Sequence, residues 1–322
     1  MTSPAESGAL AIVVVNYGSH LLLASNLVQV SRSVPEADVV VVDNYTSATE
    51  QAAVSALCAD HGWTLVASPV NAGFGAGMNQ GVEEATRRGN TRFLLLNPDA
   101  TIDPRSVGLM VSAVDADPLA LVAPTIVTSS GAVWFAGADL HLGFGRSRAT
   151  RHRAGFPGER FEPWLSGACL LVTLDLWSRV GGFDERYFLY WEDIDLSMRA
   201  VRNGGRLTLL EEARAVHDEG GTHGEEHQGS ARGKSSVYYF YNIRNRLLFA
   251  AQHLEAKDRR RWILNSPLAA WDVLLQGGRR QLLRSAAPLR AAVTGTCAGL
   301  ALHARERTAQ RRQRRSDPID QR

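Results

Sequence analysis

Short apolar runs that end in polar residues alternate with helical patterns along the first 100 residues of the chain. The runs are rich in Val, Leu and Ile, as the buried strands of a parallel sheet are. The expected strands are 9–18, 37–47, 63–70 and 91–100, and the expected helices are 19–33, 50–62 and 75–90. This alternation predicts βαβ units in a doubly wound α/β sheet.

Beyond residue 100 the pattern is less regular but still mixes strands and helices. The arginine-rich stretch 145–160 is expected to be a mobile loop that becomes ordered when substrate binds. The remaining expectations are a helix at 107–118, short strands within 119–170, a strand, short helix and turn within 164–187, one or two strands within 205–224, and helices from 235 to about 315. We therefore divide the chain into a domain of residues 1–234 and a helical extension of residues 235–322.

Polar side chains follow each of the first four expected strands. In sheets of this kind, ligands bind at the carboxyl ends of the strands. The side chains in question are Asn16, Asp43, Asn44, Asn71, Asn97 and Asp99. Their repeated placement predicts a binding site at one edge of the sheet.

Three acids, Glu192, Asp193 and Asp195, lie within four positions of the stretch "FLYWEDIDLSMRA". A helix that begins near Glu192 would place acids in its first turn, where the helix dipole favours them. Asp195 and Arg199 have the spacing of an ion pair on a helix face. Asp193 has no such structural explanation, so it is the candidate for a catalytic role.

Three further motifs each allow a structural and a functional interpretation. Asp99, with Asp103 four residues on, could bind a divalent cation, or "NPD" could simply form a turn. The glycine-rich segment 71–79 could approach a phosphate or a sugar, or form a tight turn, but its spacing does not fit a dinucleotide-binding fingerprint. His217, with His223 and His227 nearby, could be a metal ligand or a structural residue.

Composition and charge place the chain among globular proteins with a basic end. Of the 322 residues, 45% are apolar and 21% charged, and the three cysteines lie far apart, which favours a reducing compartment. We expect neither a signal peptide nor a transmembrane helix. Residues 1–243 carry 18 Lys and Arg against 27 Asp and Glu, whereas residues 244–322 carry 17 against 6.

The basic end suggests an anionic partner, either a membrane surface or a nucleic acid. An apolar stripe flanked by arginines is typical of a helix that lies on an anionic bilayer. The alternative is a pair of helices packed on the main domain. The proposed stripe consists of Trp262, Leu268, Trp271 and Leu275. Because no recognised nucleic-acid-binding module is present, we expect no nucleic acid as partner.

The order of the motifs carries more information than any one of them. "VVVNY", "VVDN", "NAGFGAGMN", "LLNPDA", "WLSGACLLV" and "GGFDERYFLYWEDIDLSMRA" follow one another as in the family 2 glycosyltransferases of the GT-A fold. The resemblance covers about residues 10–250, and the sequence looks most like bacterial rhamnosyltransferases and galactofuranosyltransferases of cell-wall assembly. It implies a GT-A fold, a Rossmann-like mixed sheet, with a helical extension.

The resemblance also implies a role for each candidate residue. Asp193 matches the catalytic base, with Glu192 and Asp195 orienting its loop or pairing with Arg199. The donor would contact Asn16, Asp43, Asn44, Asn71, Gly73, Gly77, Asn79 and Asn97. Asp99 and His217 match metal ligands, and Trp164, Ser166 and Trp191 match positions near the acceptor. The chain departs from the family pattern at Asn97, where an acid is usual, and at Thr46, where Ser is usual.

The activity implied by this resemblance is inverting glycosyl transfer that depends on Mg²⁺ or Mn²⁺. The expected donor is dTDP-L-rhamnose, and the acceptor is a saccharide or a polyprenyl-diphosphate-linked sugar. UDP-glucose, UDP-GlcNAc or UDP-galactofuranose as donor, or a non-catalytic nucleotide-sugar binder, are the alternatives. Tyr190 and Trp191 would pack on a sugar, and like-charged neighbours would raise the pKa of Asp193. We expect a cytoplasmic protein, peripheral on the inner face of the plasma membrane.

Overall fold

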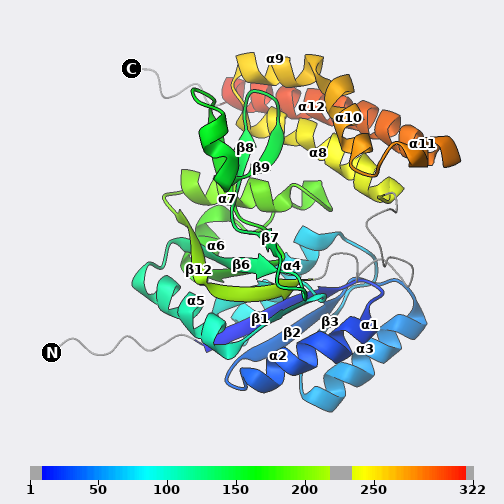
Figure 1. Cartoon of the computed structure of the whole chain (residues 1–322). Coiled ribbons are helices and arrows are strands. Elements are labelled where there is room, and N and C mark those ends of the chain that lie inside the picture. The colour runs from blue at the N-terminus through cyan, green and yellow to red at the C-terminus, as the bar shows by residue number, and fades with distance from the viewer. Residues whose placement is uncertain (1–8, 218–233, 317–322) are drawn as a thin grey trace.

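A computed structural model describes residues 9–217 and 234–316 of the chain (Figure 1). A twisted mixed sheet carries helices on both faces, and a layer of C-terminal helices lies beyond one of these faces. The expected α/β architecture with a helical extension is therefore confirmed. The boundary between residues 234 and 235 stays a prediction.

The main sheet has its parallel strands at one side and antiparallel neighbours at the other. β1 lies between β2 and β4, parallel to both, and β11 runs antiparallel to β4 and β6. In the described residues the order is β3-β2-β1-β4-β11-β6-β12-β5, with β7 paired to β6. The strands are β1 (Ala9–Asn16), β2 (Asp38–Asp43), β3 (Thr64–Ala67), β4 (Asn90–Leu96), β5 (Ala100–Ile102), β6 (Ala120–Val127), β7 (Val133–Phe135), β11 (Cys169–Thr173) and β12 (Arg206–His217).

Alternate side chains of β1 enter two separate cores, one on each face of the sheet. Ile12 and Val14 belong to the core under the first set of helices, and Val13 and Val15 to the core under the second. The first set is α1 (His20–Leu22), the π-helix η1 (Leu23–Leu27), α2 (Val28–Ser33), α3 (Ala48–His61) and α5 (Pro104–Ala116). The second set is α4 (Phe74–Arg87), α6 (Leu174–Val180) and α7 (Glu192–Arg202). Burial on both faces explains why the strand sequences are continuously apolar.

The expected fourth strand, 91–100, is in fact two strands that lie in different places. β4 ends at Leu96 in the middle of the sheet, and β5 begins at Ala100 on its far edge, paired with β12. The turn between them breaks the strand at Pro98, which has no N–H to donate. In the β5–β12 pair, Ala100 lies opposite His217. This pairing brings the residues just before β5 to the end of β12.

The arginine-rich segment is ordered secondary structure in the described chain, which corrects the expectation of a loop. It forms a second antiparallel sheet and is tied down by three ion pairs, which are Arg153–Asp139, Arg160–Asp258 and Arg146–Asp272. Within 145–160 lie β9 (Arg146–Ala149) and the 3₁₀ helix η2 (Thr150–Gly155). The flanking strands β8 (Ala138–His141) and β10 (Phe161–Trp164) complete the sheet, in the order β10-β8-β9.

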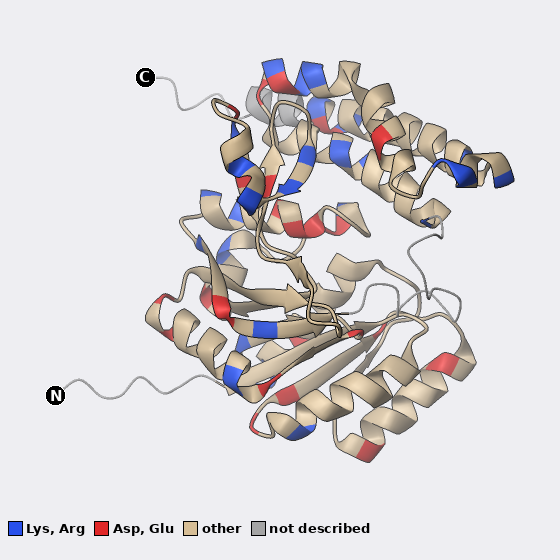
Figure 2. Ribbon diagram, in the orientation of Figure 1, with Lys and Arg blue, Asp and Glu red and all other residues tan. Residues whose placement is uncertain are grey.

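The C-terminal helices pack on one another and on α7. They are α8 (Ser236–His253), α9 (Ala256–Leu264), α10 (Ser266–Leu275), α11 (Arg280–Arg284) and α12 (Ala287–Ser316). Trp262 is fully buried against Trp191 and Phe249, so the expected surface stripe is wrong at this position. Figure 2 shows Lys and Arg on α9, α11 and the β8–β9 hairpin. Within residues 9–217 and 234–316, none of the helices is long and apolar enough to cross a bilayer.

Candidate active site

The ends of β1 and β2 bring a cluster of polar side chains together. The Asn16 side chain donates to Asp43 Oδ1 at 2.9 Å and to Glu50 Oε1 at 3.1 Å. Glu50, from α3, also accepts the backbone N–H of His20 at 2.7 Å. The second oxygen of Asp43 is buried and has no hydrogen-bond partner in the described part of the chain. This oxygen could accept a hydrogen bond from a ligand.

Glu50 was not singled out in the sequence, because it lies seven residues beyond the strand end that it completes. Burial acts to raise its pKa, and hydrogen bonds from His20 and Asn16 outweigh it, so the pKa lies below its ordinary value. A carboxylate that stays ionised keeps Asn16 oriented toward Asp43. The only local signal was its place in the first turn of α3, behind the N-cap Ser47.

Two of the predicted donor-binding residues form hydrogen bonds with the backbone of the glycine-rich loop after β3. Asn44 donates to the carbonyl of Gly73 at 3.0 Å and accepts the N–H of Ala72 at 2.8 Å. Asn71 Oδ1 accepts the N–H of Gly73 at 2.9 Å. Gly73 has a φ of 94°, and a Cβ there would lie 2.5 Å from the carbonyl oxygen of Phe188. The two asparagines shape this loop, and only glycine fits at its end.

Gly77 and Asn79, further along the same motif, face other parts of the protein. A Cβ at Gly77 would lie 2.9 Å from Val15, so this glycine lets α4 approach β1 closely. The Asn79 amide accepts the N–H of Phe183 at 2.8 Å and donates to its carbonyl at 3.0 Å. Their place in the structure therefore differs from the expected contact with donor. Asn79 instead anchors the "GGFD" turn that precedes the acid-rich helix.

Asp99 and His217 meet at the junction of β5 and β12, as the strand pairing requires. His217 Nε2 lies 3.1 Å from Asp99 Oδ1, and both side chains are buried. Apart from this contact, Asp99 Oδ1 has no polar partner among the described residues, and His217 Nδ1 has none there. Buried polar atoms without partners are rare unless a ligand or ion satisfies them. One carboxylate and one imidazole fit a Mg²⁺ or Mn²⁺ ion whose remaining ligands are phosphate oxygens and water.

Two further residues near Asp99 and His217 differ from what the sequence suggested. Asp103, expected as a second cation ligand, caps α5 instead, with its oxygens accepting the Ser106 N–H at 2.9 Å and hydroxyl at 2.7 Å. Trp134, which no sequence motif singled out, contacts the His217 ring in a tilted arrangement, with 4.7 Å between ring centroids and 53° between ring planes, and is 38% exposed. No group of three or more potential ligands occurs within 9–217 and 234–316. Asp99 and His217 are therefore the candidate cation ligands within the described residues, and His223 and His227 lie outside them.

The backbone just before α7 is strained. Phe188, Tyr190 and Trp191 have positive φ angles of 64°, 66° and 76°, a conformation that non-glycine residues rarely adopt. Each such residue costs about 1–3 kcal/mol, and such strain concentrates at functional sites. The carbonyl of Phe188 accepts the N–H of Phe74 at 2.7 Å, which joins this turn to the glycine-rich loop. The start of α7 is thereby placed beside the loop that follows β3.

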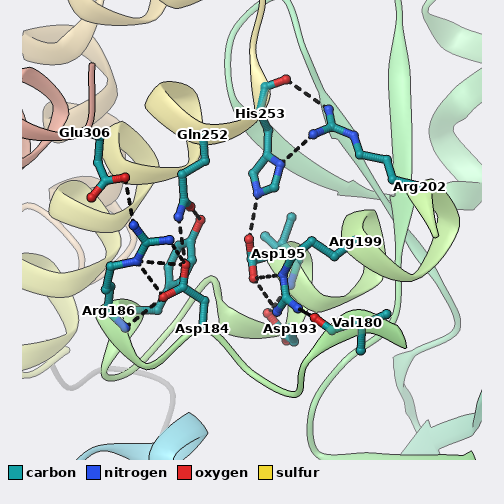
Figure 3. A network of polar contacts seen from close by, with 12 residues as sticks. Val180, Asp184, Arg186, Asp193, Asp195, Arg199, Arg202, Gln252, His253 and Glu306 are labelled. Carbon is teal, nitrogen blue, oxygen red and sulfur yellow. Dashed lines mark hydrogen bonds and ion pairs between the residues drawn. The ribbon is translucent and has the colours of Figure 1, made fainter. Parts of the chain in front are cut away.

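Within α7 the three acids occupy different environments. Asp193 accepts the N–H of Gly167 at 3.2 Å and that of Ile194 at 2.8 Å. Asp195 is buried between Arg199, at 2.6 Å, and His253 of α8, also at 2.6 Å (Figure 3). The expected pair of Asp195 and Arg199 is confirmed, and with both oxygens in ion pairs Asp195 is a structural acid. Only Asp193 remains as the candidate base.

Burial controls the protonation of the other two acids. It raises the pKa of Asp193 to about 6, against the lowering effect of hydrogen bonds from Gly167 and Ile194. Burial, with the charge of Asp193 second, holds the pKa of Glu192 well above its ordinary value. Of the two acids, Glu192 is the one whose charged form is also disfavoured by the charge of its neighbour. The expectation that neighbouring charges raise the pKa of Asp193 is replaced by an effect of burial.

The three predicted acceptor residues lie in different environments, and only some of them are close to Asp193. Ser166 is buried beside Gly167, in the segment that hydrogen-bonds Asp193, and Trp164 donates its indole N–H to Ser147 at 2.9 Å. Trp191 is only 9% exposed and packs against Trp262, which differs from the expected contact with a sugar. The ring of Trp191 instead fastens the C-terminal helices to α7.

Backbone hydrogen bonds connect the two halves of the site. The N–H of Asn97 donates to the carbonyl of Ala168 at 3.0 Å, and the adjacent Gly167 N–H donates to Asp193. Asn97 itself precedes Asp99 by two residues. The candidate base, the candidate cation ligands and the glycine-rich loop therefore surround one region at the carboxyl ends of the strands. Such a region suits a ligand that carries both a diphosphate and a group to be deprotonated.

Comparison with known proteins places the sequence among glycosyltransferases. Residues 93–304 match glycosyl transferase family group 2, and residues 11–166 match glycosyl transferase family 2. An N-acetylglucosaminyl-diphospho-decaprenol L-rhamnosyltransferase of Mycobacterium tuberculosis is 29% identical over 246 residues, 67% of this chain and 78% of that protein. A hexosyltransferase of low-salt glycan biosynthesis from Haloferax volcanii is 24% identical, over 74% of each chain.

The fold is also similar to that of a solved glycosyltransferase. A mannosyltransferase from Pyrobaculum calidifontis, in complex with GDP-Man and Mn²⁺, superposes with a TM-score of 0.53 over 95% of this chain and 84% of its own. The two sequences are 17% identical. The expected GT-A architecture is confirmed by this likeness.

Proposed function

The chain belongs to glycosyl transferase family 2, and we propose that it transfers a sugar with inversion, using Asp193 as the base. The observation that carries the proposal is the hydrogen bond from Gly167 to Asp193, next to the bond from Asn97 to Ala168. These bonds support the proposal because they connect the segment that contacts Asp193 with the turn that carries Asp99. A transferase needs these two functions side by side, because the hydroxyl attacks as the diphosphate leaves.

Each group of the chain then has a chemical task. The acceptor hydroxyl gives its proton to a carboxylate oxygen of Asp193 while its oxygen forms the new bond to the anomeric carbon. The bond from that carbon to the diphosphate oxygen breaks, and its electron pair leaves with the nucleoside diphosphate. Asp99 and His217 would hold a divalent cation, which supplies positive charge for the departing diphosphate. Asp43 Oδ2, which has no hydrogen-bond partner in the described part of the chain, would accept a hydrogen bond from the nucleobase.

For substrates, we propose dTDP-L-rhamnose as donor and a polyprenyl-diphosphate-linked saccharide as acceptor. The mycobacterial relative, whose name states both rhamnosyl transfer and a diphospho-decaprenol acceptor, supports this choice. UDP-glucose, UDP-GlcNAc and UDP-galactofuranose are the competing donors. A non-catalytic binder is disfavoured by Asp193, because binding a nucleotide sugar requires no base.

The donor is tested by thermal unfolding of the full chain with dTDP, UDP and GDP, each with and without Mn²⁺. A ligand at about a hundred times its Kd stabilises the folded state by about 2.7 kcal/mol. We expect dTDP with Mn²⁺ to raise Tm most, and dTDP-L-rhamnose to release dTDP in the presence of acceptor. NMR of the product would show the inverted anomer. A larger rise in Tm with UDP than with dTDP would indicate that the donor is a UDP-sugar. Binding of a nucleotide sugar without turnover of any donor would favour a non-catalytic binder.

We also propose that the C-terminal helices lie on an anionic membrane, where a lipid-linked acceptor would be found. Large apolar side chains are exposed beside arginines, each of which contributes about 1 kcal/mol near an anionic surface. The exposed apolar residues are Leu264, Leu268, Trp271, Leu283, Leu289 and Val293, and the exposed arginines are Arg279, Arg280, Arg284 and Arg290.

Co-sedimentation with vesicles tests this surface. We expect binding to vesicles with about a third of anionic lipid, weak binding to neutral ones, and a loss of at least about tenfold in Trp271→Glu/Leu283→Glu. Leu21→Glu is the control, since Leu21 is 69% exposed, between Trp271 at 47% and Leu283 at 90%, but lies on α1 of the main domain. Equal losses in both variants, or equal binding to neutral vesicles, would contradict the proposed membrane surface.

A further inference from the structure

The strained turn before α7 does not hold itself in place. Its three residues with positive φ are large and aromatic, so nothing in their own sequence favours this backbone. Such a conformation persists only where the surrounding structure fixes it. The source of that constraint lies more than fifty residues later in the chain, on α8.

One side chain of α8 binds most of the turn. Asn245 is 0% exposed, and its amide nitrogen lies 2.7 Å from the carbonyl oxygen of Tyr187, 2.9 Å from that of Leu189 and 2.8 Å from that of Tyr190. Its neighbour Arg244 donates to the carbonyl of Arg186 at 2.8 Å. Four carbonyls of residues 186–190 are thus bound from one turn of α8.

An asparagine is well suited to this position. The convergence of three carbonyl oxygens calls for a donor without accompanying negative charge, and a neutral amide provides two N–H groups. An aspartate of the same shape would point a carboxylate at those oxygens instead. Its burial would make the mismatch costly, because a buried polar group without a partner loses its hydration.

The bound turn connects the two parts of the site. Its Phe188 carbonyl accepts the N–H of Phe74 in the glycine-rich loop, and its Trp191 carbonyl accepts the N–H of Asp195 in the first turn of α7. Further along α8, Gln252 donates to Asp184 at 2.7 Å and His253 contacts Asp195, as Figure 3 shows. The same face of α8 therefore contacts both ends of the segment that carries Asp193.

We propose that Asn245 is a positioning residue that fixes Asp193 relative to the donor loop by holding the turn of residues 187–190. This inference rests on the proposed function, because it assigns the consequence of the contact to proton transfer from the acceptor. Asn245 does not touch the reacting atoms. It acts through the backbone conformation that starts α7.

The test compares Asn245→Asp with Asn242→Asp. Asn242 lies one turn earlier on α8, and its amide donates to Tyr238 in its own helix, so it is a matched control. Hydrogen exchange of residues 184–196 should increase in Asn245→Asp and stay unchanged in Asn242→Asp. Because misplacement by about 1 Å can cost about 10²-fold, kcat should fall by about that factor, with the KM for donor changed far less. Arg244→Ala, a milder change, should give a smaller loss of kcat.

The outcomes separate this inference from the proposed function. Unchanged exchange in Asn245→Asp would overturn the positioning role, whatever the activity. Increased exchange with an unaltered kcat, or a fall in kcat matched by equal loss of nucleotide affinity, would also overturn it. If Asn245→Asp does not fold, Arg244→Ala decides by the same two readouts. If the wild-type chain is inactive but Asn245→Asp still increases hydrogen exchange, the proposed function is contradicted. The role of Asn245 in holding the turn of residues 187–190 would then still stand.

Discussion

Replacing Asp193 by Asn is expected to lower kcat by about 10²–10⁴-fold, the usual contribution of a positioned base. Asn keeps the shape and can still accept the Gly167 N–H, so donor affinity should change little. The measurement is steady-state kinetics with nucleotide binding followed in parallel. The neighbouring Glu192→Gln is the matched control, and it should retain most of the activity because burial disfavours the charged form of Glu192 and Gln keeps its shape.

The pH dependence follows from the same carboxyl group. Since the pKa of Asp193 is about 6, activity should fall as pH drops through 6, and Glu192→Gln should leave this acid limb in place. The folded pKa lies above the ordinary 3.8, so the folded state binds the proton more tightly, and ionisation above pH 6 costs stability. Asp193→Asn should therefore raise Tm at pH 8 by a few degrees while it removes activity. A fully active Asp193→Asn variant would exclude it as the base.

Removal of divalent cations is expected to lower activity by about 10²–10³-fold, because several kcal/mol of charge stabilisation are lost and each 1.4 kcal/mol is about tenfold. Chelation by EDTA followed by addition of Mn²⁺ or Mg²⁺ measures this directly. Asp99→Asn should reproduce the loss at ordinary metal concentrations. It should also abolish the rise in Tm that Mn²⁺ and nucleotide produce together, because Asp99 provides the carboxylate of the pair.

Asp103→Asn is the control for the cation site. Asp103 lies four residues away but caps α5, and Asn is an equally good cap, so both stability and metal dependence should be retained. His217→Ala should raise the Mn²⁺ concentration needed for half-maximal activity. Activity that resists EDTA, or an Asp99→Asn variant with normal metal dependence, would show that the pair does not bind the cation.

The sequence predicted the architecture because its signals were local. Continuous apolar runs such as the four valines 39–42 are buried on both faces of the sheet, and the polar residues after such runs lie at one edge, where Asn16 and Asp43 are hydrogen-bonded. The start of α7 at Glu192 was also predicted correctly, since apolar spacing fixes the phase of a helix.

What the sequence could not provide was the direction of individual side chains. Asn44 and Asn79 belong to polar motifs but hydrogen-bond neighbouring backbone, and Trp191 belongs to an apolar core with Trp262. These contacts depend on segments that are far apart in the chain. The split between β4 and β5 was missed for the same reason, because the partner of β5 is a strand more than a hundred residues later.

The contact between α8 and the turn of residues 187–190 has a consequence for the order of synthesis. Domains tend to fold from the N-terminus as the ribosome produces them. The strands β1 to β4 and the glycine-rich loop are complete long before residues 244–253 emerge. Until then Asn245 is absent and the strained turn has no clamp. A nascent chain would therefore acquire its nucleotide-binding half first and its base geometry last, so that the capacity for turnover matures with the final helices.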